Sequence, residues 1–140
     1  MSEFRYNRLL EVKEKLLEHK QTELEIAIAS VAAVVSEIEN VARETADTYD
    51  QLTSRPMTGR ELSILTGYLS YLDEKKARLY EEKGKREARV STLRSELQAL
   101  EIELKILEKL KAKALEVLRK ARNRKEQRVM DDLALRIEGK

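Results

Sequence analysis

The stretch SRPMTGRE, residues 54–61, decides the fold because it separates two long helical patterns. Pro56 has no backbone N–H and disfavours helical geometry at Arg55, so a first helix is expected to end there. Thr58 and Glu61 match a T-x-x-E capping box, in which each side chain satisfies a backbone N–H at the start of a new helix. A short connection makes two long helices antiparallel neighbours. The stretch therefore predicts a helical hairpin with its turn at about residues 55–58.

Upstream of the turn, mostly apolar residues recur in alternating steps of four and three. The predicted positions of this repeat are Leu24, Ile28, Val31, Val35, Ile38, Ala42, Thr45, Tyr49 and Leu52. The same phase is weaker toward the N-terminus, where Gln21 and Glu14 alternate with Leu17 and Leu10. A repeat averaging 3.5 residues keeps one helix face toward a partner, as in coiled coils. We predict a first helix at about residues 3–54.

Downstream of the turn, a second repeat has the same spacing. Its predicted positions are Leu62, Leu65, Leu69, Leu72, Lys76, Leu79, Lys83, Arg86, Val90, Leu93, Leu97, Leu100, Leu104 and Leu107. Polar residues between 76 and 86 weaken its middle, and Gly84 lowers helix propensity there by about 1 kcal/mol. We expect fraying or bending near Gly84, within a second helix at about residues 59–137.

The two predicted helices differ in length. If Leu52 faces Leu62, opposite residues have numbers that add up to about 114, so Leu10 faces about Leu104. Glu3 is then level with about Lys111, and the residues past Lys113 have no partner in the chain. This overhang has roughly 25 residues and a length of about 37 Å. The predicted fold class is all-α: a long two-helix antiparallel coiled-coil hairpin with a C-terminal helix overhang, forming a single domain over residues 1–140.

Composition limits the kinds of chemistry that the chain could carry. Charged residues make up 39% of the 140 residues, so any core is a narrow strip rather than a large globular interior. There is no Cys, which excludes disulfides, thiolate metal sites and cysteine nucleophiles. No glycine-rich phosphate motif occurs, and a hairpin offers no pocket that excludes water. We therefore expect no enzyme activity, no cofactor and no metal.

Three smaller signals have an ordinary interpretation. His19 and Glu23 are four residues apart on one helix face, which favours a solvated surface pair over a weak metal site. Asp131 and Asp132 point to different helix faces, which suits solubility better than chemistry. No run of 18 apolar residues occurs, so we expect a cytoplasmic protein without a membrane-inserted segment.

Charge is unevenly distributed along the chain although the net charge is only +2. Residues 23–50 hold seven acids against Arg43 alone, and residues 119–128 hold six bases against Glu126 alone. The candidate site residues of the overhang are the bases Arg119, Lys120, Arg122, Arg124, Lys125 and Arg128, with Leu118 and Val129 as apolar contacts. Docking into a protein of opposite charge is favoured over a merely solvated helix end. A nucleic-acid partner is less favoured because no aromatic residue, which could stack on a nucleobase, lies among the Arg and Lys residues.

The other candidate site lies near the turn, where Tyr49, Tyr68 and Tyr71 cluster. Tyr68 and Tyr71 are three residues apart and share a helix face. Exposed aromatic residues are enriched at protein interfaces. Tyr49 lies on the predicted repeat, so core packing is favoured for it over partner binding.

The chain resembles the FliJ family of flagellar type III export proteins, whose injectisome counterparts are the YscO-like proteins. The likeness rests on FRYNRLLEVKEKLLE (4–18), YLSYL (68–72) and above all NRKEQRVMDDLALR (123–136). The resemblance implies a cytoplasmic antiparallel coiled coil similar to the gamma-type stalk of rotary ATPases. It would lie at the inner face of the cell membrane through its partners rather than by insertion.

The resemblance also implies partners. The end that carries both termini would enter the hexameric export ATPase and promote its assembly and activity, and residues 119–128 match that half. The end near the turn would contact the cytoplasmic domain of the export-gate membrane protein, and Tyr49 and Tyr71 match aromatic positions of that face. Some family members also handle export chaperones.

Two alternatives remain open at this stage. The chain could be a free-standing structural coiled coil, or a homodimer that buries the overhang against its twin. A stable dimer in sedimentation at micromolar concentration would favour that class, and a monomer would favour an adaptor. A nucleic-acid-binding helical hairpin would instead show steeply salt-dependent binding to any duplex.

Overall fold

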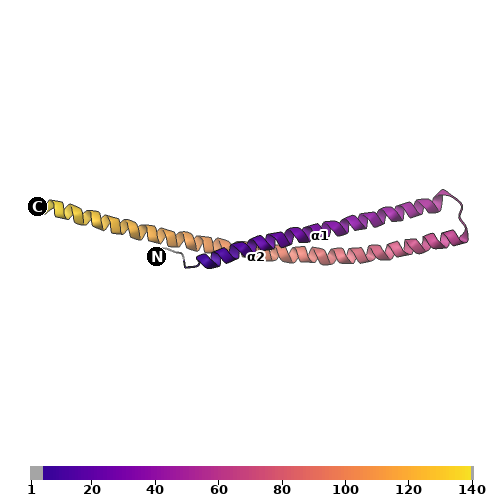
Figure 1. Cartoon of the computed structure of the whole chain (residues 1–140), viewed down its shortest axis with the longest axis horizontal. Coiled ribbons are helices and arrows are strands. Elements are labelled where there is room, and N and C mark those ends of the chain that lie inside the picture. Colours follow the sequence, from indigo (N-terminus) through magenta and orange to yellow (C-terminus); the bar gives the residue numbers. More distant parts are fainter. Residues whose placement is uncertain (1–4, 140) are drawn as a thin grey trace. The chain divides into compact units, whose positions relative to one another are not determined.

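The computed structural model describes residues 5–139 and consists of two helices, α1 (Asn7–Ser54) and α2 (Gly59–Glu138), as Figure 1 shows. The helices pack against each other in antiparallel orientation, which confirms the predicted all-α hairpin. The first helix was predicted to begin at about residue 3, whereas α1 begins at Asn7. Glu3, which was expected to be level with Lys111, lies outside the described residues. The expectation of a single domain stays a prediction.

At the start of α2, the connection between the helices forms part of the predicted capping box. Thr58 Oγ1 accepts a hydrogen bond from the backbone N–H of Glu61 at 3.2 Å, and the Thr58 carbonyl accepts one from the N–H of Leu62 at 3.0 Å. Within residues 5–139, the Glu61 carboxylate makes no return bond to Thr58, so half of the capping box is formed. The helix start is thus capped by the threonine side chain alone.

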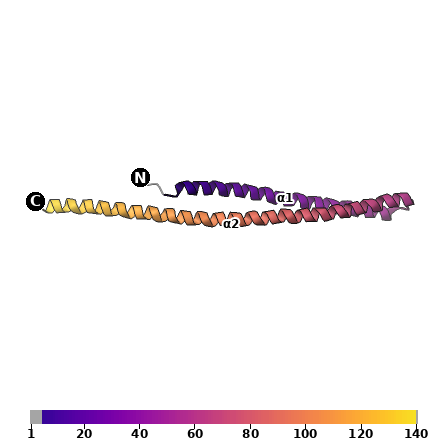
Figure 2. The ribbon, with the colours of Figure 1, turned by 90° about the horizontal axis from the view of Figure 1, so that it is seen from below.

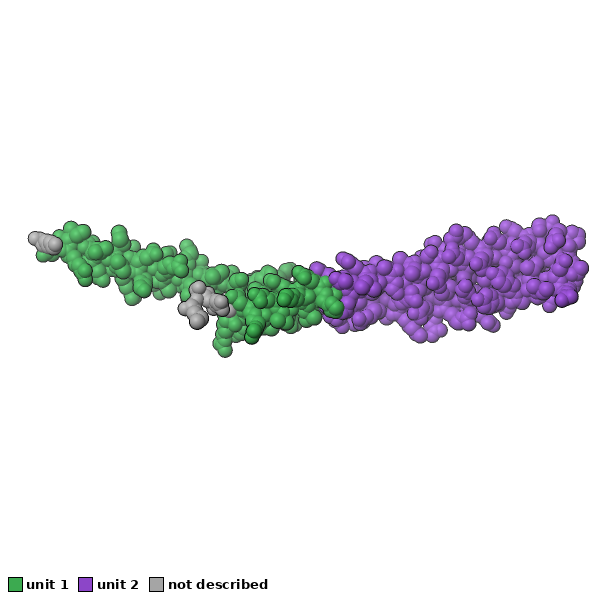
Figure 3. All heavy atoms as spheres, viewed as in Figure 1, with its two compact units in different colours: residues 1–19, 97–140 green, residues 20–96 purple. Residues whose placement is uncertain are grey.

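The chain forms two compact units, coloured separately in Figure 3. Unit 2 is Lys20–Glu96 and contains the turn. The described part of unit 1 comprises residues 5–19 and 97–139. Each unit has its own apolar cluster, built from both helices.

In unit 2, Ala27 of α1 packs with Val90 and Leu93 of α2, and Leu24 and Val31 flank this cluster. In unit 1 the corresponding cluster consists of Leu10, Leu104 and Leu107, with Leu17 packed against it. The contact of Leu10 with Leu104 confirms the predicted register. Only one strip of each helix is buried, as a two-helix coiled coil requires.

The buried strip of α1, which we call the α1 seam, differs from the predicted repeat at every second position. Its residues, all buried or half-buried, are Leu10, Lys13, Leu17, Lys20, Leu24, Ala27, Val31, Val34, Ile38, Val41, Thr45, Thr48 and Leu52; half-buried residues beside it are Asn7, Glu23, Ser30 and the predicted Val35. The prediction that Tyr49 lies on the seam is wrong, because Tyr49 is 55% exposed while Thr48 is 4% exposed. The same shift by one residue moves Ile28 to the surface.

The cause of the error is that α1 has apolar residues in both phases of the repeat. Val34 precedes Val35, and Val41 precedes Ala42, so hydrophobicity alone does not choose between them. The polar residues distinguish the two phases of the repeat. The true phase places Lys13 and Lys20 at the edge of the seam, where both meet acids of α2.

Two ion pairs across the helices illustrate this register. Lys13 Nζ lies 2.8 Å from Glu103 Oε2 in unit 1, and Lys20 Nζ lies 2.7 Å from Glu96 Oε2 in unit 2. Each lysine covers apolar surface with its stem and places its charge at the rim. Ion pairs of this kind contribute little to stability but fix which residues face each other.

Every predicted repeat position of α2 from Leu65 to Leu107 is buried or half-buried except Lys76, which is exposed. Leu62 is exposed as well. Lys75, Glu82 and Glu96, outside the predicted repeat, are half-buried. The fraying expected at Gly84 is not found, since α2 is one continuous helix through that residue. A polar residue in the middle of the repeat finds a hydrogen-bond partner across the helices: an Arg86 guanidinium nitrogen donates to the Ser30 carbonyl of α1 at 3.0 Å.

The predicted overhang is present in unit 1. Every residue from 115 to 139 is exposed, and no other described residue of the unit packs against this part of α2 (Figure 2). We keep the name overhang for residues 115–139. Neither described helix contains a stretch that is long and apolar enough to cross a bilayer.

Candidate functional site

The overhang is helical because it continues a helix that is already formed. The nucleation cost that makes short isolated helices unstable is met within the hairpin. Local side-chain pairs add support: Arg119 bonds to Glu116 at 2.6 Å, and Gln127 donates to Asp131 at 3.1 Å. Its residues are mostly strong helix formers such as Leu, Arg, Lys, Glu and Ala. The helix therefore extends without tertiary packing.

The predicted bases of the overhang are not equivalent. The Arg119 guanidinium bonds the Glu116 carboxylate, which lowers the pKa of Glu116 and raises that of Arg119. Within residues 5–139, no carboxylate forms an ion pair with the remaining five bases, which are Lys120, Arg122, Arg124, Lys125 and Arg128. These five carry the free positive charge of the segment.

The free bases also point in different directions. Lys120, Arg124 and Arg128 follow one another at steps of four, so they share a helix face. Arg122 lies about 160° around the helix from Arg124, because each residue turns the helix by 100°. Lys125 lies on the flank between the two faces. The segment predicted as one basic site thus has a basic face and a second, mixed face, and Asp131, seven residues after Arg124, follows on the basic face.

The mixed face is an apolar strip with a charged centre, which we call the overhang stripe. Its residues are Leu115, Leu118, Arg122, Glu126, Val129, Leu133 and Ile137, all exposed. Arg122, Glu126 and Val129, together with Lys125 and Met130, also line a shallow hollow on the helix surface. Apolar side chains lie at both ends of the stripe, and Arg122 and Glu126 lie in the middle.

The positions of the overhang stripe follow steps of three, four and four, although the residue types do not repeat with this spacing. A repeat of 11 residues, or 3.67 per turn, differs from the 3.5 of the hairpin and gives no left-handed supercoil. Extending the 3.5 repeat along the chain missed this stripe. Sorting residues 115–137 by helix face, at 100° per residue, would have found it in the sequence.

The tyrosines near the turn are divided between two surfaces of unit 2. The rings of Tyr68 and Tyr71 stack with centroids 6.1 Å apart and an angle of 25° between their planes. The Tyr68 hydroxyl donates to Glu44 Oε2 at 2.8 Å. This hydrogen bond, with smaller contributions from desolvation and from the Glu44 charge, raises the pKa of Tyr68.

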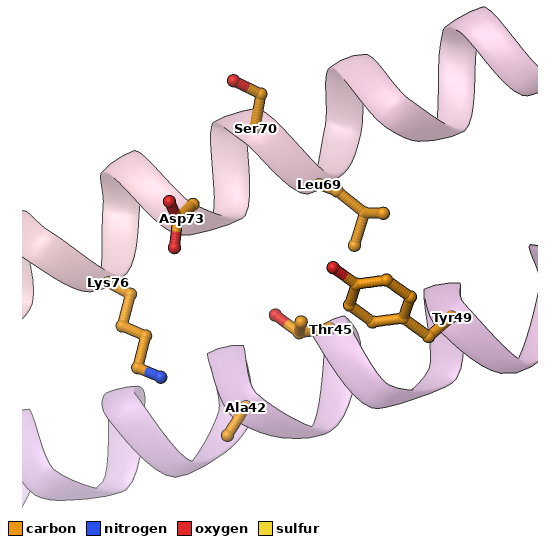
Figure 4. Close-up of a pocket in the computed structure, with 7 residues that line it drawn as sticks. All are labelled: Ala42, Thr45, Tyr49, Leu69, Ser70, Asp73 and Lys76. Carbon is orange, nitrogen blue, oxygen red and sulfur yellow. The ribbon is translucent and has the colours of Figure 1, made fainter.

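Tyr49 lies on the other side of the seam. It is five residues beyond Glu44, which corresponds to about 140° around α1. Figure 4 shows its ring in an open groove of about 420 Å³ between the helices, near Leu69. The other groove residues are Ala42, Thr45, Ser70, Asp73 and Lys76. The structure thus brings Tyr68 and Tyr71 together and separates both from Tyr49.

Glu23, one half of the predicted surface pair with His19, has cationic neighbours in unit 2. Glu23 lies 3.4 Å from an Arg89 guanidinium nitrogen and 3.6 Å from Lys20 Nζ, so its carboxylate is engaged by two cations. In the part of the chain that the structure describes, no group of three His, Cys, Asp or Glu residues is arranged to hold a metal ion.

A family model described as flagellar FliJ protein matches residues 1–138, which is nearly the whole chain. The chain belongs to the FliJ family. Comparison with curated proteins gives no match, and neither does comparison with solved structures. FliJ proteins are non-catalytic proteins of flagellar export, and the two-helix hairpin found here accords with that role.

Proposed function

We propose that this FliJ protein is a stalk-like adaptor of the flagellar type III export apparatus. In this proposal, the overhang binds the hexameric export ATPase and promotes its assembly and activity. The end of the hairpin near the turn binds the cytoplasmic domain of the export gate, and export chaperones are further partners. The protein would work in the cytoplasm, at the inner face of the membrane through these contacts.

The observation that carries the proposal is the exposure of the overhang. The overhang exposes Leu115, Leu118, Val129 and Leu133 to solvent, together with unpaired basic side chains. A partner would cover this apolar area. A binding site for it should offer acids opposite the basic face and apolar side chains opposite the overhang stripe. Such electrostatic complementarity chiefly sets association rate and specificity.

A direct test reverses charge on the overhang. In the variant Arg122→Glu, Arg124→Glu, Lys125→Glu, stimulation of the purified ATPase should require about tenfold more protein or disappear, because like charges would then meet. The measurement is ATP hydrolysis against concentration of added protein, with helicity followed by circular dichroism. The matched control reverses Arg94, Lys105 and Lys109, which are exposed bases of α2 in the hairpin.

The control separates a specific site from general charge. Equal loss in both variants would refute the assignment of the ATPase site to the overhang, and so would undiminished stimulation by the first variant. Tight, steeply salt-dependent binding of the unmodified protein to duplex DNA would instead support the nucleic-acid alternative.

The division of the tyrosines allows a second test at the turn end. Tyr49→Ala alters the groove surface, while the pair Tyr68→Ala, Tyr71→Ala removes the stacked rings on the other side. Binding of each variant to the cytoplasmic domain of the export gate, measured by titration calorimetry, shows which side is used. ATPase stimulation should stay unchanged in both. Loss of ATPase stimulation with intact gate binding would reverse the two ends.

A further inference from the structure

The overhang stripe has an internal symmetry, and this symmetry points to a second copy of the chain as a partner. Read in the two directions from about residue 124, its side chains are complementary: Leu115 corresponds to Leu133, and Leu118 corresponds to Val129. Between them, Arg122 corresponds to Glu126. A surface that complements itself under a two-fold rotation forms an isologous contact between two copies.

We propose that the overhangs of two copies of this chain pair in antiparallel orientation about residue 124. In this dimer, each Arg122 meets Glu126 of the partner subunit, and this ion pair occurs twice. Leucine and valine side chains cover one another on either side of the charged centre. This inference concerns the chain alone and does not rest on the proposed ATPase contact.

Charge fixes the orientation of the pairing. A parallel arrangement would place Arg122 against its own copy and Glu126 against its own copy, so like charges would meet twice. Like-charge contacts across an interface disfavour the wrong arrangement. The basic face with Lys120, Arg124 and Arg128 points away from the dimer contact and stays exposed in either copy.

The geometry of unit 1 leaves room for the second copy. In the paired region, residues 115–133 of the two chains overlap, and none of them packs on α1. α1 begins at Asn7, and its first buried residue, Leu10, packs on Leu104 and Leu107. In this register Leu107 is level with a point beyond residue 139 of the partner subunit, so neither α1 enters the overlap.

The area involved is small. Four large apolar side chains per copy are between 44% and 52% exposed and would be largely covered: Leu115, Leu118, Val129 and Leu133. With the stems of Arg119 and Arg122 the pair buries roughly 1,000 Å², near the lower limit for a specific interface. Area alone does not fix affinity, but contacts at this limit are weak, and we expect a dissociation constant on the order of 100 µM.

Sedimentation equilibrium of the full chain over a wide concentration range tests the proposal. Arg122→Glu and Glu126→Arg should each weaken the dimer about tenfold, since two attractive pairs become two repulsive ones. The double variant Arg122→Glu, Glu126→Arg should restore it. Arg124→Glu is the matched control, with the same charge change two residues away on the outward face, and should alter the dissociation constant less than twofold.

Cross-linking tests the orientation independently, and the natural chain contains no cysteine that would interfere. A mixture of Leu118→Cys and Val129→Cys chains should give mixed dimers with a short bifunctional maleimide, whereas either variant alone should give none. A chain that stays monomeric at millimolar concentration overturns the proposal. So does a dimer that cross-links efficiently in either single variant, or one that Arg124→Glu weakens as much as Arg122→Glu does.

Discussion

Leu93→Ala should destabilise the hairpin far more than the same substitution in the overhang. Leu93 is 1% exposed and belongs to the cluster with Ala27 and Val90. Truncation removes the buried methyl groups and leaves a cavity, which costs about 3 kcal/mol in a well-packed site. For a chain of this size, that loss lowers the melting temperature by about 12 °C.

Leu115→Ala is the matched control, because it makes the same chemical change on the same helix at a residue that is 52% exposed. Surface substitutions away from specific contacts change stability by less than about 0.5 kcal/mol. Thermal unfolding followed at 222 nm compares the two variants, at a protein concentration of a few micromolar so that the proposed dimer is dissociated.

Equal destabilisation by the two substitutions would contradict the fold described here, since it would mean that residue 115 is packed in the monomer. A Leu93→Ala protein with an unchanged melting temperature would show that α1 does not cover this part of α2. Either result would remove the distinction between hairpin and overhang on which both proposals depend.

Gly84→Ala should raise the free energy of unfolding by about 1 kcal/mol, as measured by urea titration, because an added Cβ meets nothing within 4 Å. Lys20→Met should abolish a pH-dependent part of the stability. The Lys20 hydrogen bond lowers the pKa of Glu96 in the folded state. The stabilisation from this pair is therefore present above the ordinary carboxyl pKa and is lost as the pH falls through the lowered pKa of Glu96. Melting temperatures in neutral and acidic buffers test this. Glu44→Gln should lower the raised pKa of Tyr68, which tyrosinate absorbance reports in an alkaline titration.

Each of these changes has a control in the chain. Gly139→Ala should give no gain, because its Cβ would lie 3.2 Å from the Leu135 carbonyl oxygen. Lys105→Met removes an exposed lysine of α2 and should leave the acid dependence of stability unchanged. Glu39→Gln removes an exposed acid of α1 other than Glu44 and should leave the Tyr68 pKa as it is. A departure from these outcomes would contradict the local cause given for the corresponding effect.

The features of the fold that were predictable depend on local signals. Pro56 and the Thr58 cap mark the turn in the sequence, and the leucine repeat of α2 has one clear phase from Leu65 to Leu107. Those two facts also fix the register, and the register with the helix lengths gives the overhang. Each step uses residues whose preferences do not depend on distant contacts.

The features that were missed depend on packing between helices. In α1, Val34 and Val35 are equally apolar, and the phase found is the one that brings Lys13 and Lys20 to acids of α2. Once the phase changes, Tyr49 leaves the seam and faces the groove, on the side away from Tyr68. The division of the bases in the overhang into two faces follows from helical geometry alone, and treating residues 119–128 as one charged run concealed it.

The change of repeat within α2 limits what could lengthen the hairpin. A first helix extended upstream with a heptad pattern would need a left-handed path along α2, but the apolar residues beyond Leu115 follow a path of opposite hand. The mismatch amounts to about 20° per heptad for a straight helix, so such an added segment would lose the stripe within a few turns. A designed helix that follows the overhang stripe would therefore need a different twist from that of α1, such as the twist of an 11-residue repeat.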